Sequence, residues 1–88
     1  MKNTREIVLR VLSEIQEQQG YRPITPEDHL RVVKDLGFAS LDIAQLIAML
    51  EMEMGWDPFS QGVAITQVHT VGELIEVYEA KDLAGAAL

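Results

Sequence analysis

The chain has 88 residues, with 7 Lys+Arg against 14 Asp+Glu and a formal net charge of −7. This length accommodates a single domain, residues 1–88, and the acidic balance argues against nucleic-acid binding, because phosphate backbones require a basic surface. There is no cysteine, which excludes disulfide bonds and thiolate metal sites and fits a reducing compartment.

The N-terminal segment predicts a helix from Thr4 to Gln19. Its apolar residues recur with the 3.6-residue period of a helix that is buried on one face. They are Ile7, Val8, Val11, Leu12 and Ile15. Asn3 and Glu6 resemble a capping box, with Thr4 as a competing cap, and Gly20 is placed to end the helix. This start has no signal-peptide segment, and no apolar run approaches the roughly 20 residues that span a bilayer. We therefore expect a freestanding cytoplasmic protein that does not bind membranes.

Residues 21–38 form a long connection. Pro23 and Pro26 interrupt any regular element, and the apolar anchors of the segment follow them. These anchors are Leu30, Val32, Val33 and Leu36. Connections of this length in compact domains pack down or carry function. We expect this one to lie across the helices, with a short helical turn around residues 28–34.

A second helix is predicted from Ser40 to Met54, with Ser40 as its cap and Gly55 as its end. One apolar stripe suffices for the core: Ile43, Leu46, Ile47, Leu50 and Met54. A second set, here called the outer ridge, lies on another side at roughly i, i+4 spacing: Leu41, Ala44, Ala48 and Met52. A helix that is apolar on more than one side is central in its fold or meets a partner.

The remaining segment predicts a short helix and a final long one. Residues 56–62 are irregular, and we expect their large apolar side chains, Trp56, Pro58 and Phe59, to pack against the core. A short helix is expected over residues 64–68. Thr70 and Glu73 form a capping box that opens the last helix, and residues 82–88 are expected to fray. With no strand alternation, the pattern indicates an all-α bundle of three main helices and one short helix.

The sequence has few residue patterns that are typical of catalytic or metal-binding sites. His29 and His69 have no Cys or Asp at triad or metal-ligand spacing, so each is assigned a solvated or capping role. Gly37 alone does not make a phosphate-binding loop, and Glu51 with Glu53 is typical of a solvated helix face. We therefore expect no catalytic residue and no metal site.

Ser40 has two interpretations. A serine at a predicted helix start is usually a structural cap. Its surroundings, however, read Leu36-Gly37-Phe38-Ala39-Ser40-Leu41. This stretch resembles the attachment motif of the acyl carrier proteins, commonly Leu-Gly-x-Asp-Ser-Leu, in every position but one. The resemblance extends over nearly the whole chain and implies an acyl-carrier-like four-helix bundle with a long loop between its first two helices.

That resemblance implies that Ser40 carries 4′-phosphopantetheine, transferred from coenzyme A by a phosphopantetheinyl transferase. The arm then holds acyl groups as thioesters, so the chain itself is a non-catalytic carrier. It also implies a monomer that meets acyl-loading and acyl-processing enzymes through basic or apolar docking surfaces. The residues expected to contact these partners are Asp35, Ala39, Leu41, Asp42, Ala44, Gln45, Ala48, Glu51 and Met52.

Two positions depart from the family pattern. Ala39 stands where the family commonly has Asp, and Gln45 stands where many members have Glu. We therefore expect a narrow set of partners, as in polyketide or peptide assembly, with partner choice depending on Ala39. Two alternatives stay open: an interaction module without a prosthetic group, in which Ser40 is only a cap, and a peptidyl or aminoacyl carrier.

Overall fold

The computed structural model describes residues 3–87, and it describes side chains for residues 3–80. It contains three α-helices, α1 (Thr4–Gln19), α2 (Ser40–Met54) and α3 (Val71–Ala87), and two short 3-10 helices, η1 (Pro58–Gln61) and η2 (Ile65–Gln67). Within these residues there is no strand, and the single β-bridge joins Arg31 to Thr70. The predicted all-α fold is confirmed.

The bounds of α1 and α2 agree with the sequence prediction, and their ends show why. The Asn3 side chain accepts a hydrogen bond from the Glu6 N–H at 2.8 Å, as an N-cap does. Gly20 and Gly55 end the two helices with φ angles of 69° and 81°. These angles lie in the left-handed region, which glycine adopts without steric cost.

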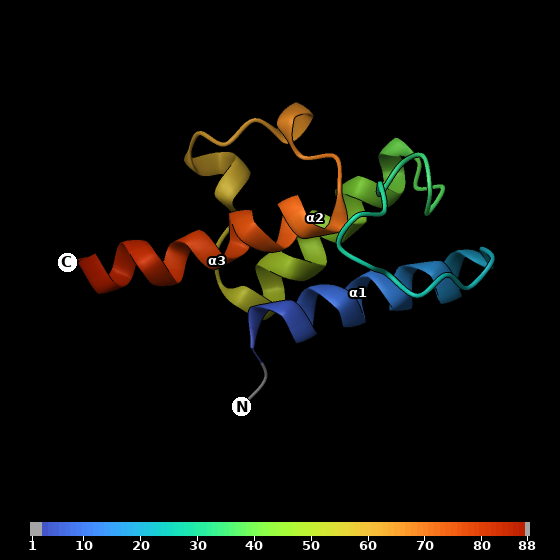
Figure 1. Cartoon of the computed structure of the whole chain (residues 1–88), viewed down its shortest axis with the longest axis horizontal. Coiled ribbons are helices and arrows are strands. Elements are labelled where there is room, and N and C mark those ends of the chain that lie inside the picture. The colour runs from blue at the N-terminus through green and yellow to red at the C-terminus, as the bar shows by residue number, and fades with distance from the viewer. Residues whose placement is uncertain (1–2, 88) are drawn as a thin grey trace.

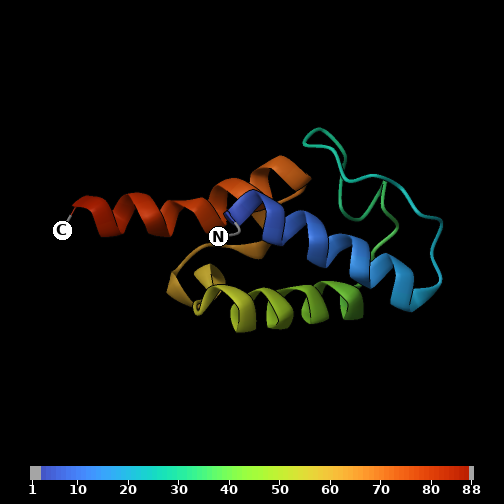
Figure 2. The same ribbon diagram turned by 90° about the horizontal axis from the view of Figure 1, so that it is seen from below.

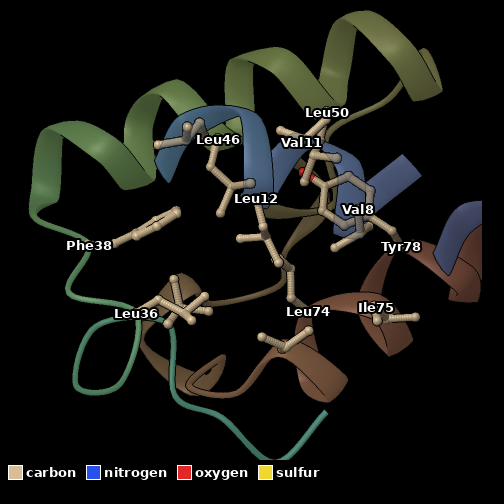
Figure 3. Packing of buried hydrophobic residues seen from close by; sticks show 13 residues of the cluster. Val8, Val11, Leu12, Leu36, Phe38, Leu46, Leu50, Leu74, Ile75 and Tyr78 are labelled. Carbon is tan, nitrogen blue, oxygen red and sulfur yellow. The ribbon is translucent and has the colours of Figure 1, made fainter. Parts of the chain in front are cut away.

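The helices pack around a core to which the long connection also contributes. α1 runs opposite in direction to α2 and α3, and the end of α3 extends beyond the other helices (Figures 1 and 2). Figure 3 shows the core side chains meeting between the helices and the connection. They are Val8, Val11, Leu12 and Ile15 of α1, Leu46 and Leu50 of α2, Val71, Leu74, Ile75 and Tyr78 of α3, and Val32, Leu36 and Phe38 of the connection. Burying these aliphatic and aromatic groups is the main driving force for the fold.

The long connection is fastened to the start of α3. The Val32 N–H donates to the His69 carbonyl, and the Val71 N–H donates to the Leu30 carbonyl, both at 2.9 Å. A short helical turn around residues 28–34 was predicted, and the structure has isolated turns but no helix there. The Leu30 N–H donates to the Glu27 carbonyl at 3.0 Å and the Asp35 N–H to the Arg31 carbonyl at 2.9 Å, but the Leu30 carbonyl and the Val32 N–H are bonded to the start of α3, so these turns do not join into a helix.

The segment between α2 and α3 packs through its aromatic residues, as expected. The rings of Trp56 and Phe59 meet the Tyr78 ring edge-on, each with a centroid distance of 6.2 Å, and Pro58 is buried. The predicted short helix over residues 64–68 is the three-residue 3-10 helix η2.

α3 begins with the predicted capping box. The Glu73 N–H donates to the Thr70 Oγ1 at 3.1 Å, and the Thr70 N–H donates to the Glu73 Oε1 at 2.9 Å. At its other end the helix continues to Ala87, through most of the stretch that was expected to fray. Several alanines, which have the highest helix propensity, occupy this end of α3. Leu88 lies outside the described residues.

Candidate functional site

Ser40 is the first residue of α2, and its side chain is exposed. The capping position belongs to Ala39, whose φ of −90° and ψ of 172° are extended. The prediction that Ser40 caps the helix is therefore wrong, because a cap must precede the first helical residue. The Ser40 side chain makes no hydrogen bond with any described residue. It presents a free hydroxyl at the start of a helix.

The backbone N–H groups beside this hydroxyl are open. The first hydrogen bond of α2 runs from the Ile43 N–H to the Ala39 carbonyl, so the N–H groups of Ser40, Leu41 and Asp42 have no partner among residues 3–87. Ala39 has no side-chain oxygen to accept from them. Such a helix start carries a partial positive charge and suits an anionic group.

Asp42, in the first turn of α2 and two residues after Ser40, is 3% exposed. Its Oδ2 accepts a hydrogen bond from the Tyr21 hydroxyl at 2.5 Å and another from the Ala39 N–H at 2.9 Å. The hydrogen bond to Asp42 raises the pKa of Tyr21, with burial adding to the effect. Asp42 was expected to contact partner proteins. This expectation is corrected, because Tyr21 and Ala39 hold its carboxylate inside the fold.

The outer ridge lies on the solvent side of α2. Leu41 is 80% exposed and Met52 is 86% exposed, while Ala44 and Ala48 between them are also exposed. On the opposite side of the helix, Leu46 and Leu50 are buried in the core. The predicted division of α2 into a core side and an outer ridge is therefore present, and a role of the ridge in partner contact stays a prediction.

The other residues expected at the partner surface have different neighbours. Gln45 is half-buried and donates to the Oε1 of Gln18 on α1 at 2.6 Å. The Asp35 side chain is exposed and accepts from the Arg31 N–H at 2.7 Å. Ala39 and Glu51 are exposed. The structure thus brings Ala39, Ser40 and the outer ridge onto one face, with Gln45 at its edge beside α1.

The fold has a counterpart among solved proteins. No family profile and no curated protein matches the chain. One similar structure is the solution structure of MacpD, an acyl carrier protein from Pseudomonas fluorescens involved in mupirocin biosynthesis. The TM-score is 0.73 and the sequence identity 36%, over 84% of this chain and 66% of MacpD, just under two thirds of its length. The chain belongs to the acyl carrier protein family. The resemblance predicted from Leu36–Leu41 and the helix pattern is thereby confirmed.

This acyl carrier protein has an apolar cavity of about 190 Å³ beside α2. Ile43 and Ile47 line it, and they lie three and seven positions after Ser40 along α2. Val33 of the long connection and Ile65 of η2 also line it. The segment between α2 and α3 therefore has two tasks: Trp56 and Phe59 pack on the core, and η2 helps to form the cavity.

No metal-binding cluster of His, Cys, Asp or Glu occurs in the part of the chain that the structure describes. None of the helices within residues 3–87 combines the length and apolar character needed to cross a bilayer. His29 and His69 are both exposed, and neither lies in a group of ionisable residues that would hold a metal.

Tyr21 is the residue of this site that sequence reasoning missed. It was assigned only to the long connection, yet its hydroxyl reaches the start of α2. The signal in the sequence was Asp42, an acidic residue at the third position of a helix whose cap, Ala39, lacks a side-chain oxygen. Such a carboxylate needs donors, but the sequence alone does not indicate which element supplies them.

Proposed function

We propose that this acyl carrier protein bears 4′-phosphopantetheine on Ser40 and presents acyl intermediates as thioesters to the enzymes of a specialised pathway such as polyketide assembly. The observation that carries the proposal is the free, exposed Ser40 hydroxyl at an open helix start, within the motif and fold of the family. The mupirocin pathway to which MacpD belongs supports a specialised pathway.

The chemistry requires no catalytic group in this chain. The Ser40 oxygen attacks the phosphorus of coenzyme A that is bonded to pantetheine, and an O–P bond forms. The bond to the second phosphate breaks, and adenosine 3′,5′-bisphosphate leaves. A base of the phosphopantetheinyl transferase takes the hydroxyl proton. The open N–H groups of Ser40, Leu41 and Asp42 then face the phosphodiester, which gains hydrogen bonds and a favourable helix dipole.

The cargo we propose is an acyl or polyketide group, in preference to an aminoacyl group. The cavity beside α2, the helix that Ser40 begins, is lined mostly by aliphatic side chains, which favour an apolar chain over a charged amine. Partner enzymes that act on Ser40 approach the face that carries Ala39 and the outer ridge. Because the ridge is apolar, we propose that apolar contacts contribute to their docking.

Mass spectrometry of the intact protein tests the attachment site. After incubation with coenzyme A and a broad-specificity phosphopantetheinyl transferase, the wild type should gain the mass of one phosphopantetheine group, and Ser40→Ala should gain none. Ser13→Ala is the matched control, because Ser13 is an exposed serine in the middle of α1, and this variant should be modified like the wild type.

An unmodified wild type would favour the alternative of an interaction module without a prosthetic group, in which the outer ridge binds a partner. A mass gain that persists in Ser40→Ala would contradict the assignment of the site.

A further inference from the structure

The start of α2 is tied to the end of α1 through one buried oxygen. The Oδ2 of Asp42 accepts from both the Tyr21 hydroxyl and the Ala39 N–H. Tyr21 follows Gly20, the residue that ends α1, and its N–H donates to the Gln16 carbonyl at 2.9 Å. A hydrogen-bonded path therefore runs from α1, through Tyr21 and Asp42, to the residue that precedes Ser40.

Aromatic packing holds the same path in place. The Tyr21 ring lies 6.3 Å from the Phe38 ring at an interplanar angle of 48°, and Phe38 is 2% exposed. Tyr21 thus restrains two consecutive residues before Ser40: it packs its ring against Phe38, and it is linked to Ala39 through Asp42. Figure 3 shows Phe38 pointing from the chain just before α2 into the core.

Ser40 itself has no such restraint. Its side chain and its N–H have no partner within the described residues, so its position depends on Ala39 before it and on the helix after it. Ala39 is held by its carbonyl, which accepts from the Ile43 N–H at 3.0 Å, and by its N–H, which donates to Asp42. Losing the second bond frees the peptide that directly precedes the reacting residue.

We propose that Tyr21 and Asp42 are positioning residues for the modification of Ser40: their hydrogen bond fixes Ala39 and thereby holds the Ser40 hydroxyl where a transferase needs it. The inference rests on the proposed attachment at Ser40. It concerns geometry and not charge, because both donors meet a single oxygen of Asp42, and an uncharged amide oxygen in that place can accept both bonds.

The central experiment compares the kinetics of phosphopantetheine transfer to the wild type and to Tyr21→Phe. The phenylalanine keeps the ring on Phe38 and removes only the hydroxyl. We expect kcat to fall about tenfold with KM within about twofold of the wild type, because misplacing a reacting group slows the chemical step while the docking surface stays intact. Tyr78→Phe is the matched control, since the buried Tyr78 hydroxyl has no hydrogen-bond partner among the described residues, and it should react like the wild type.

Two further variants separate geometry from charge. Asp42→Asn keeps an oxygen for Tyr21 and Ala39, and its kcat should stay within about threefold of the wild type. Asp42→Ala removes the acceptor and should lose at least as much as Tyr21→Phe. Hydrogen exchange supplies a readout that does not depend on the transferase: in Tyr21→Phe the Ala39 amide should exchange about tenfold faster, while amides in the middle of α2 stay unchanged.

The outcomes distinguish this inference from the proposed function. If the wild type is modified and Tyr21→Phe reacts at the same kcat, the positioning role is wrong and the attachment at Ser40 stands. If Asp42→Asn loses as much as Asp42→Ala, charge and not geometry is what matters, and the inference is overturned. If the wild type is not modified at all, the proposed function fails and the positioning role fails with it.

Discussion

Asp42 and Glu73 occupy the same position, the third residue of their helices, and each accepts the backbone N–H of the preceding cap residue at 2.9 Å. The difference lies in the cap. The Thr70 Oγ1 accepts a hydrogen bond from the Glu73 N–H, whereas Ala39 has no side-chain oxygen that could accept one from the Asp42 N–H. The start of α3 is therefore closed, and the start of α2 is open.

The closed start of α3 predicts a pH dependence of stability. Hydrogen bonds from the backbone N–H groups of Thr70 and His69 lower the pKa of Glu73 from its ordinary value of 4.5. A carboxylate whose pKa is lower in the folded state stabilises the fold above its unfolded pKa, and this contribution is lost as the pH falls through the folded pKa. Thermal unfolding should thus show a falling midpoint as the pH drops below about 4.5.

Glu73→Gln supplies the comparison. The amide cannot titrate, so the difference in melting temperature between the wild type and this variant should shrink as the pH falls. Glu76→Gln, an exposed change one turn further along α3, should leave the pH profile nearly unchanged. A constant difference between the wild type and Glu73→Gln from pH 7 to pH 3 would contradict this role of Glu73.

At the scale of elements, the N-terminal part of α2 presents an uncharged surface in an acidic protein. From Ser40 to Ala48 its outward residues are small, apolar or amide side chains, and the first exposed carboxylate is Glu51. Electrostatic attraction of a partner is therefore weak around Ser40, the proposed attachment site. Contacts to the outer ridge should depend more on apolar burial and less on salt concentration.

Leu41→Glu tests the ridge. Since Leu41 is 80% exposed, the change should leave the stability of the fold nearly unaffected. It places a charge where we expect an apolar contact, so KM for phosphopantetheine transfer should rise about tenfold with kcat nearly constant, because an unpaired charge at an interface costs affinity. Ser13→Glu adds the same charge to the exposed side of α1 and should not change KM. Equal KM values for both variants would exclude the ridge from docking.

The sequence predicted the helices better than it predicted the site. α1 and α2 end at left-handed glycines and begin at local signals, so their bounds follow from a few neighbouring residues. The burial of Asp42 depends on Tyr21, which is 21 positions away and joined to it only by the packing of the fold. The cap of α2 was assigned to Ser40, one residue after the true cap, Ala39. The sequence shows that Ser40 has a side chain suited to capping, but it does not show that the backbone of Ala39 is extended.

At the scale of the whole molecule, the long connection behaves as part of the core. It is held to α1 by the Gln16 side chain, which is 3% exposed and bonds both the N–H and the carbonyl of Ile24, at 2.8 and 3.0 Å. It is held to α3 by the bonds of Leu30 and Val32, and Asp28 pairs with Arg5 through two hydrogen bonds. These links explain how a connection without regular structure carries buried residues.

Gln16→Ala tests this fastening. The variant leaves both backbone groups of Ile24 without their partner, which should lower the free energy of unfolding by about 2 kcal/mol. Gln18→Ala, on the exposed side of the same helix, loses only a surface hydrogen bond to Gln45 and should cost less than about 0.5 kcal/mol. Urea denaturation of the two variants measures the difference. Similar losses of unfolding free energy in both variants would show that the two hydrogen bonds between Gln16 and Ile24 do not hold the connection.

The packing of Trp56 has a practical consequence. This chain has one tryptophan, and its ring stands edge-on against Tyr78, at the place where the segment after α2 meets α3. Its ultraviolet emission therefore comes from a single, known location. A change in the emission wavelength or anisotropy of Trp56 reports on the contact between this segment and α3. Separation of the segment from α3 can therefore be followed in real time without an attached dye.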